Sequence, residues 1–277
     1  MIQRILTLSS YLLRSLLFSF TGLIYLLGAL AYYILLFSPG QRTPDVDYFI
    51  LVLGAFGGGF TFLVTLSNAA RANRAESYTL MARLPSRVEY LTAVVSSSLL
   101  FATLVQIILA LLVWQFGGTE LNAGRVLEIP PLWLALNLLI AVVALHASDF
   151  VAVGWSRSIL FGILLALLFL QSYGANIANW LGDRFAGMAN WLLVRGTFNL
   201  VDFFQRGANW LHSNGADAIS QLVNVIFWPF RAVLDATIAG FFQDAQALAP
   251  AILLLYATFL FFLASDLLAG KDLYLVE

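Results

Sequence analysis

Six stretches of this chain are apolar over most or all of the length that a helix needs to cross a bilayer, and this feature limits the possible folds more than any other. A helix crosses the hydrocarbon core with about 20 mostly apolar residues. The stretches are, in chain order, Leu16–Phe37, Tyr48–Leu66, Tyr90–Trp114, Leu132–Phe150, Ile159–Tyr173 and Ala249–Ala269. They predict an all-α integral membrane protein with six transmembrane helices, organised as one membrane domain over residues 1–277.

Composition agrees with this prediction and excludes several classes of function. Hydrophobic residues make up 61% of the chain and charged residues 10%, whereas soluble domains are about 45–50% apolar and about 25% charged. A net charge of −1 gives no indication of a nucleic-acid partner. The chain has no cysteine, which excludes disulfides, thiolate metal sites and cysteine nucleophiles. The partner that composition predicts is membrane lipid.

Basic residues in short loops and termini indicate which side of the membrane is cytoplasmic. With a cytoplasmic N-terminus, the basic residues on the inner side are Arg4, Arg14, Arg71, Arg74, Arg83, Arg87, Arg157 and Lys271. The short loops on the other side carry only Arg42 and Arg125. The sequence therefore predicts a multi-pass protein of the plasma (inner) membrane with its N- and C-termini in the cytoplasm.

Two further segments are amphipathic rather than uniformly apolar. Residues 1–15 place apolar side chains at near-helical spacing, which predicts a helix lying in the inner membrane interface. Residues 174–248 repeat this pattern with several tryptophans, which predicts extracytoplasmic amphipathic helices at headgroup depth. Within them, residues 221–242 are apolar enough to enter the bilayer, but a proline and two charges favour a bent or re-entrant element.

Two further sequence features concern how the predicted spans pack and how they are connected. Gly54 and Gly58 form a small-xxx-small pair, which lets helix backbones approach closely. The pair packs either within one chain or against a second subunit, and the sequence leaves both open. Residues 116–131 are polar and carry a pair of prolines, which predicts a plain connector between the third and fourth spans.

The loop over residues 67–90 collects charge in a chain that has little of it. Arginines that hold the flanking spans in place explain the charge but not the rest of the loop. Residues 76–81 predict a short helix with an apolar side, and Pro85 then breaks the pattern. A short exposed helix with apolar side chains and a charged rim is typical of a surface that docks into a groove of a soluble partner.

The third span begins directly after this short helix. Ser86 is a good N-cap residue for a helix that starts near Arg87. Glu89 follows Ser86 by three residues, which is the spacing of a capping box. The loop is therefore predicted to be a short helix, a turn, and the start of the third span.

This loop resembles the cytoplasmic loop of ABC-2-type permeases of ATP-binding-cassette exporters, which ends in a stretch like E…L…LP.SR.EYL. The matching positions are Glu76, Leu80, Leu84, Pro85, Ser86, Arg87, Glu89, Tyr90 and Leu91. The layout is also similar, with an N-terminal interfacial helix, six spans, cytoplasmic termini and membrane-dipping outer helices between the last two spans. The outer segment 174–248 is longer than the short hairpin usual in that family.

The resemblance implies a transporter permease that couples to a separate ATP-binding-cassette ATPase subunit. The residues it assigns to the coupling surface are Glu76, Tyr78, Leu80, Leu84, Pro85, Arg87 and Glu89. It also implies a second permease subunit, as a homodimer or a heterodimer, and no cofactor in this chain, since ATP is bound by the partner. The alternatives are a non-transporting scaffold or assembly subunit and, less favoured for lack of paired polar residues within the spans, an intramembrane enzyme.

Motifs for chemistry within the chain itself are few. No P-loop sequence occurs, so ATP hydrolysis requires another subunit. His146 and Asp149 lie three residues apart on one helical face near the inner end of the fourth span. This spacing predicts a structural hydrogen-bonded pair, with a gating or proton-transfer role or a metal site as alternatives. Few charges lie within the spans, which favours a lipid-like, amphipathic or hydrophobic cargo.

Overall fold

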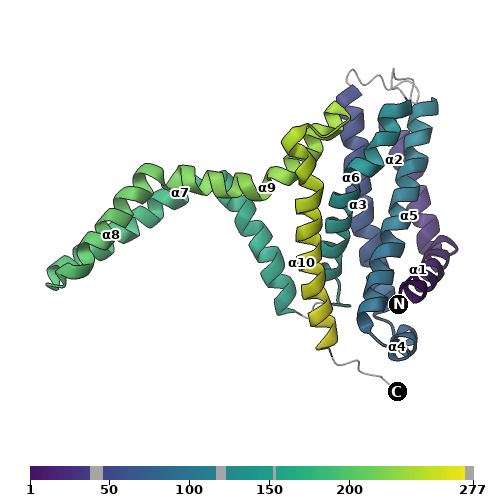
Figure 1. The fold of residues 1–277 in the computed structure, drawn as a ribbon, viewed down its shortest axis with the longest axis horizontal. Helices are drawn as coiled ribbons and strands as arrows, with labels where there is room; N and C mark the ends of the chain where they lie inside the picture. Colours follow the sequence, from purple (N-terminus) through teal and green to yellow (C-terminus); the bar gives the residue numbers. More distant parts are fainter. Residues whose placement is uncertain (38–45, 117–122, 152–153, 272–277) are drawn as a thin grey trace. The chain divides into compact units, whose positions relative to one another are not determined.

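The protein is built from helices. The computed structural model describes residues 1–37, 46–116, 123–151 and 154–271, and within these ranges every regular element is a helix (Figure 1). The elements are α1 (Ile2–Leu17), α2 (Phe20–Phe37), α3 (Val46–Ala72), α4 (Ala75–Ala82), α5 (Arg87–Phe116), α6 (Ala123–Ala147), α7 (Trp155–Val194), α8 (Phe198–Trp210), the π-helical turn η1 (Leu211–Gly215), α9 (Ala216–Ala239), the 3-10 helix η2 (Asp244–Leu248) and α10 (Ala249–Ala269).

Seven helical segments in the described residues are long and apolar enough to cross a membrane. The prediction of an all-helical, multi-pass membrane protein is confirmed at this level. The additional segment is Phe198–Ala239, which contains α8 and α9 and falls inside the predicted outer region 174–248. The number of six spans and the re-entrant element therefore stay predictions.

The chain forms two compact units. The bundle unit consists of Met1–Arg157 and Pro229–Glu277, and the hairpin unit consists of Ser158–Trp228. α7 and α9 each contribute residues to both units. Each unit is described below by itself.

α3 packs antiparallel to both α2 and α5 in the bundle unit. The hydroxyl of Tyr32 donates to the Val52 carbonyl oxygen at 2.9 Å, and that of Tyr25, earlier in α2, donates to Leu63, later in α3. Buried side chains of α3, α5, α6 and α10 then form a continuous apolar core. Close packing of the side chains in this core favours one arrangement of these apolar helices.

Side chains of the same unit occupy the space beside three glycines of α3. A Cβ at Gly54 would collide with the Trp133 ring, and one at Gly57 would collide with the Gln106 side chain. A Cβ at Gly58 would lie 3.0 Å from Ile140. Of the two contacts that the sequence left open for the Gly54–Gly58 pair, the structure shows packing within the chain.

The boundaries of two predicted spans change in the structure. The stretch Leu16–Phe37 is divided at Ser19, whose hydroxyl accepts a hydrogen bond from the Gly22 N–H at 3.1 Å and so begins α2. α6 begins at Ala123 and contains both prolines, so the prediction of a plain connector over residues 116–131 is wrong for its second half. Residues 117–122 lie outside the described residues.

The bundle unit has two ends, joined by α6. The α4 end is defined by α4, Arg87, Asp149 and Lys271, and the α9 end by Arg125 and the last residues of α9. Since a helix rises about 1.5 Å per residue, α6 separates these ends by about 35 Å. The contacts described below place the basic residues Arg4, Arg87, Arg157 and Lys271 at the α4 end, as the distribution of charge in the sequence predicts.

Candidate coupling surface

α4 is a short helix held against the bundle by one side and exposed on the other. Met81 is 2% exposed and belongs to an apolar cluster with residues of α3, α5, α6 and α10. The Tyr78 hydroxyl lies within hydrogen-bond distance of both oxygens of Asn73, at 3.1 and 3.2 Å. These contacts fix the helix at the end of the bundle, as a rigid surface for docking requires.

The exposed side of α4 carries an apolar and a basic residue. Leu80 is 37% exposed, and Arg83 follows it at the C-terminal end of the helix, also exposed. Pro85 is exposed in the turn, whereas Leu84 is half-buried against the apolar cluster. The side chain of Glu76 lies outside the described residues. Of the predicted coupling residues whose side chains are described, Leu80 and Pro85 are therefore the exposed ones.

Arg87 is directed into the protein instead. Its Nη1 donates to the carbonyl oxygens of Leu268, Ala269 and Lys271, at 3.0, 3.4 and 2.7 Å. The last carbonyls of a helix have no partner within the helix, and a cation there also opposes the negative end of the helix dipole. Arg87, at the start of α5, therefore caps the C-terminus of α10.

Glu89 also pairs within the chain. It is 4% exposed, and its Oε1 lies 3.3 Å from Nη2 of Arg4 in α1. Ser86 acts as the predicted N-cap, since its hydroxyl accepts from the Val88 N–H at 3.2 Å. The predicted capping box does not form, because the Glu89 side chain pairs with Arg4 instead. A buried carboxylate needs such a partner, because an unpaired charge away from water is costly. Glu89 thus attaches α1 to the start of α5.

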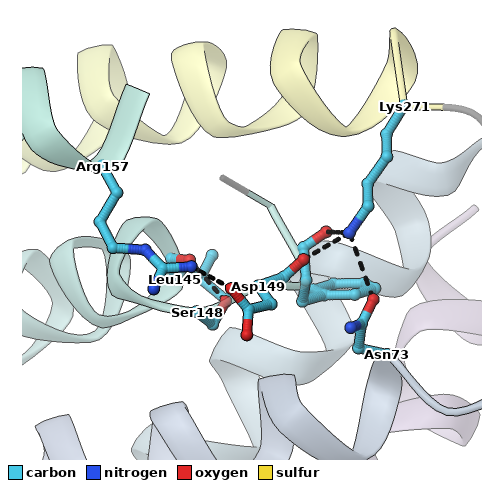
Figure 2. Close-up of polar contacts among 7 residues, drawn as sticks. Asn73, Leu145, Ser148, Asp149, Arg157 and Lys271 are labelled. Atoms are coloured by element: carbon cyan, nitrogen blue, oxygen red, sulfur yellow. Dashed lines mark hydrogen bonds and ion pairs between the residues drawn. The ribbon is translucent and has the colours of Figure 1, made fainter. Parts of the chain in front are cut away.

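Lys271 connects its own segment to the end of α3 and to the residues that follow α6, at the α4 end (Figure 2). Its Nζ donates to Oδ1 of Asn73 at 3.2 Å, to the Phe150 carbonyl oxygen at 3.2 Å, and to the Asp149 carbonyl oxygen. Partial burial lowers the pKa of Lys271 below its ordinary value, and the nearby Asp149 carboxylate opposes that shift. Because Asn73 also contacts Tyr78, the ammonium group links the end of α10 to the base of α4.

The predicted pair of His146 and Asp149 does not form. Nε2 of His146, which is 1% exposed, lies 2.9 Å from the carbonyl oxygen of Leu260 in α10. α6 ends at Ala147, so the helical register that would align the two residues stops before Asp149. The Asp149 carboxylate instead accepts from Nη2 of Arg157 (Figure 2). Each of the two residues therefore links chain segments, but each does so through a different partner.

The α9 end contains an arginine cap that the sequence interpretation missed. Nη2 of Arg125 donates to the carbonyl oxygens of Thr237, at 3.3 Å, and of Ile238, near the C-terminus of α9. The indole N–H of Trp133 donates to the Thr237 hydroxyl at 2.8 Å. The chain leaves α9 through Gly240, whose φ of +89° suits glycine. Nothing near Arg125 in the sequence indicates this partner, which lies more than 100 residues away.

Polar side chains also meet between α3 and α5, contrary to the expectation that the spans lack paired polar residues. Nδ2 of Asn68 donates to the Ser98 hydroxyl at 2.9 Å, and Nε2 of Gln106 donates to the Leu53 carbonyl oxygen at 3.2 Å. All three polar side chains are at least 96% buried, and the amide oxygen Oε1 of Gln106 has no hydrogen-bond partner. In the sequence, the recurrence of Thr61, Thr65 and Asn68 on one helical face could have indicated a polar contact here.

The described residues contain no cluster of three or more His, Asp or Glu side chains that could hold a metal ion. No protein-family model, curated protein or solved structure matches this chain. The function must therefore be argued from the geometry of the α4 end and from the resemblance of its sequence.

Proposed function

We propose that this chain is the membrane-spanning permease subunit of an ATP-binding-cassette exporter. It forms the substrate path together with a second permease subunit and couples through α4 to a separate ATPase subunit. The observation that carries the proposal is the construction of the α4 end. An exposed docking helix is anchored by Met81 and connected by polar contacts to the ends of α3, α5, α6 and α10.

The mechanism is mechanical rather than chemical. Closure of two ATPase subunits on ATP moves the α4 of each permease, and the anchored helix ends transmit that movement to the spans. The ATPase changes the conformation only to the extent that it binds the two states with different affinity. Arg87 and Lys271 are the residues that carry displacement from the loop to α10, because Arg87 binds the carbonyl oxygens at its C-terminal end and Lys271, which follows that end, binds Asn73.

The six-span topology is part of the proposal and is supported by the bundle unit alone. The chain leaves this unit after Arg157, which pairs at the α4 end, and has returned to it by Thr237, which is bound at the α9 end. If these ends face opposite sides of the membrane, the intervening segment crosses an odd number of times. A single crossing by residues 157–173 gives six spans, with both termini in the cytoplasm of a plasma (inner) membrane.

The cargo class follows from the polarity of the spans. A groove of about 570 Å³ lies between α2 and α3, lined by Ile24, Tyr25, Gly28, Tyr32, Ala55, Phe56, Gly59, Phe60 and Leu63. These residues are apolar apart from the two tyrosine hydroxyls, one of which bonds to Leu63 and the other to Val52. A lipid-like or otherwise hydrophobic cargo suits such a surface better than a multiply charged one.

The test is co-expression and co-purification of the full chain with candidate ATP-binding-cassette ATPase subunits encoded in the same genome. Leu80→Asp and Arg83→Glu change the exposed side of α4 without touching its anchor. We expect both variants to lose the ATPase and its permease-dependent stimulation, with thermal unfolding unchanged. Arg14→Glu, an equally large charge change at an exposed position of α1, is the matched control. Retention of the ATPase by both α4 variants would overturn the coupling role and favour a scaffold subunit.

A further inference from the structure

The hairpin unit is an antiparallel pair of helices. Beyond a kink at Tyr173, α7 lies beside α8 and the segment that follows it (Figure 1). Phe185 contacts Phe204 with ring centroids 5.5 Å apart, and Asp183 lies 3.5 Å from His212. The close approaches continue between Gly207 and Phe185, Gly182 and His212, Gly215 and Ala178, and Gly174 and Ile219. Residue numbers rise on one helix as they fall on the other, which establishes the antiparallel register.

Each helix of the pair has an apolar stripe outside the contact between them. The contact is made by small and apolar residues, among them Ala178, Ala189 and Ala208, each at most 1% exposed. The exposed stripes consist of Trp180, Met188 and Trp191 on α7 and Leu200, Phe203 and Trp210 on α8, each at least 51% exposed. At 100° per residue, the stripe on α7 is offset from the contact by about 130° and the stripe on α8 by about 80°, in the same rotational sense. In an antiparallel pair, offsets in the same sense place both stripes on one side, called the tryptophan side below.

Charges are segregated between this side and the opposite one. Arg184 and Arg195 follow Trp180 and Trp191 by four residues, so they lie on the tryptophan side. Their guanidinium carbons lie 5.4 and 4.1 Å from the centroids of those tryptophan rings. Arg206 follows Phe203 by three residues and precedes Trp210 by four, so it lies on the same side. Asp183 projects from the opposite side with Asn179 and Asn190, and Asp202 points away from the contact between the helices. The tryptophan side of the described hairpin is therefore basic.

We propose that the hairpin lies flat on the surface of an anionic phospholipid bilayer, with its tryptophan side inserted at headgroup depth and Arg184 and Arg195 binding lipid phosphates. Tryptophan prefers the membrane interface, and a guanidinium binds phosphate through paired hydrogen bonds while its face stays on an aromatic ring. The asparagine-rich side then faces water. Insertion of a basic, amphipathic surface is strengthened by anionic lipid.

The connection to the preceding apolar segment gives the depth at which the hairpin starts. Residues 157–173 extend about 25 Å as a helix, close to the roughly 30 Å thickness of the hydrocarbon core. Tyr173, with φ of −121° and ψ of 16°, interrupts the helix where such a crossing ends. The hairpin therefore leaves the bilayer core at the level where its aromatic and basic residues find headgroups. This inference does not depend on the proposed transport function.

Site-directed spin labelling of the full chain tests the orientation, since a chain without cysteine takes a label only at an introduced one. The labelled variants are Met188→Cys and Phe203→Cys on the tryptophan side and Asn190→Cys and Gln205→Cys on the opposite side, in nanodiscs of phosphatidylcholine with or without phosphatidylglycerol. We expect labels at 188 and 203 to collide several-fold more with oxygen than with a water-soluble nickel chelate, and labels at 190 and 205 to show the reverse. Equal access of the nickel chelate to both sets would overturn the proposal.

The role of the arginines is tested in the Met188→Cys background. Phosphatidylglycerol should move this label deeper, and Arg184→Gln combined with Arg195→Gln should strongly reduce that shift. Asn190→Asp combined with Gln205→Glu lowers the charge by the same amount on the opposite side, so it is the matched control and should retain the shift. Arg184→Lys with Arg195→Lys keeps the charge and should retain part of the shift, which excludes misfolding as the cause. An equal response in the double glutamine variant and the control would overturn the proposal. The proposal would also be overturned if neither oxygen nor the nickel chelate reached the labels and the spectra showed spin–spin broadening. A second copy of the chain would then cover the tryptophan side.

Discussion

Two helices of the bundle unit end against an arginine from another helix, one at each end of the unit. At the α4 end, Arg87 donates to three carbonyl oxygens at the C-terminus of α10. At the α9 end, Arg125 donates to two carbonyl oxygens near the C-terminus of α9. The chemistry is the same in both places, since each cation satisfies carbonyls that lack an intrahelical partner.

The surroundings of the two caps differ. Arg87 is one member of a group that includes Lys271, the pair of Arg4 and Glu89, and the pair of Arg157 and Asp149. Arg125 is accompanied by one neutral hydrogen bond, from Trp133 to Thr237, and an ion pair with Glu128 at 3.5 Å. The α4 end is therefore fastened by several charged contacts that connect different helices, whereas the α9 end fastens one segment to α6.

This difference indicates where the bundle can transmit displacement. A movement imposed on α4 reaches the C-terminus of α10 through short, directional contacts, because Asn73, Lys271 and Arg87 bridge segments far apart in the sequence. The α9 end retains the returning chain but offers no comparable network in the described residues. Four changes separate the two ends experimentally, and they are given in order of decreasing expected effect.

The largest effect is expected from Arg87→Met. Three carbonyl oxygens at the end of α10 lose their donor, and leaving partly buried acceptors unsatisfied costs about 2–3 kcal/mol of unfolding free energy. Unfolding in mixed detergent micelles measures the change. Arg83→Met, which removes an exposed arginine from the same loop, is the control and should leave the midpoint unaltered. Equal midpoints for the two variants would show that the cap contributes nothing.

Gly240→Ala should have the next largest effect, at the opposite end. The backbone φ of +89° is unfavourable for a residue with a side chain, and the added Cβ would collide with the Arg125 guanidinium. We expect a loss of about 2 kcal/mol from strain and displacement of the cap. Gly28→Ala, at a helical position with open space around it, is the control and should be neutral or slightly stabilising. If both alanines behave alike, the turn at Gly240 is not constrained.

Arg125→Met should cost less, about 1–2 kcal/mol, because fewer carbonyls depend on it. Hydrogen exchange locates the effect. We expect faster exchange in residues 234–239 with no change in residues 264–269, and the reverse pattern for Arg87→Met. Faster exchange at both helix ends in either variant would mean that the ends unfold together and that the comparison between them does not hold.

The sequence was sufficient for features set by local pattern and insufficient for those set by distant partners. Hydropathy located the apolar helices, and Pro85 with Ser86 located the start of α5 near Arg87. The partners of Arg87 lie 181–184 residues away, and a charged side chain in a loop looks the same whether it faces solvent or a helix end.

The start of α6 was misplaced for a different reason. Pro130 and Pro131 resemble the end of a connector, because proline lacks the N–H that an interior helical position donates. In membrane helices, neighbouring groups satisfy the carbonyls that proline frees, so the helix continues. The predicted coupling set combines neighbouring residues whose side chains have different surroundings. Leu80 and Pro85 are exposed, but Arg87 and Glu89 belong to the interior contacts of the bundle end.

The smallest expected effect is a coupling energy, and it tests the comparison most directly. Arg87 donates to the backbone of Lys271, and the Lys271 ammonium group holds the same chain end from the other side. Arg87→Met and Lys271→Met should therefore be non-additive, with the double variant losing about 0.5–1 kcal/mol less than the sum, because the first change already releases the segment. Arg87→Met and Arg125→Met, at opposite ends, should add to within about 0.5 kcal/mol. Additivity in the first cycle, measured by the same unfolding experiment, would mean that Arg87 and Lys271 act independently and that the α4 end is a set of separate contacts rather than a connected one.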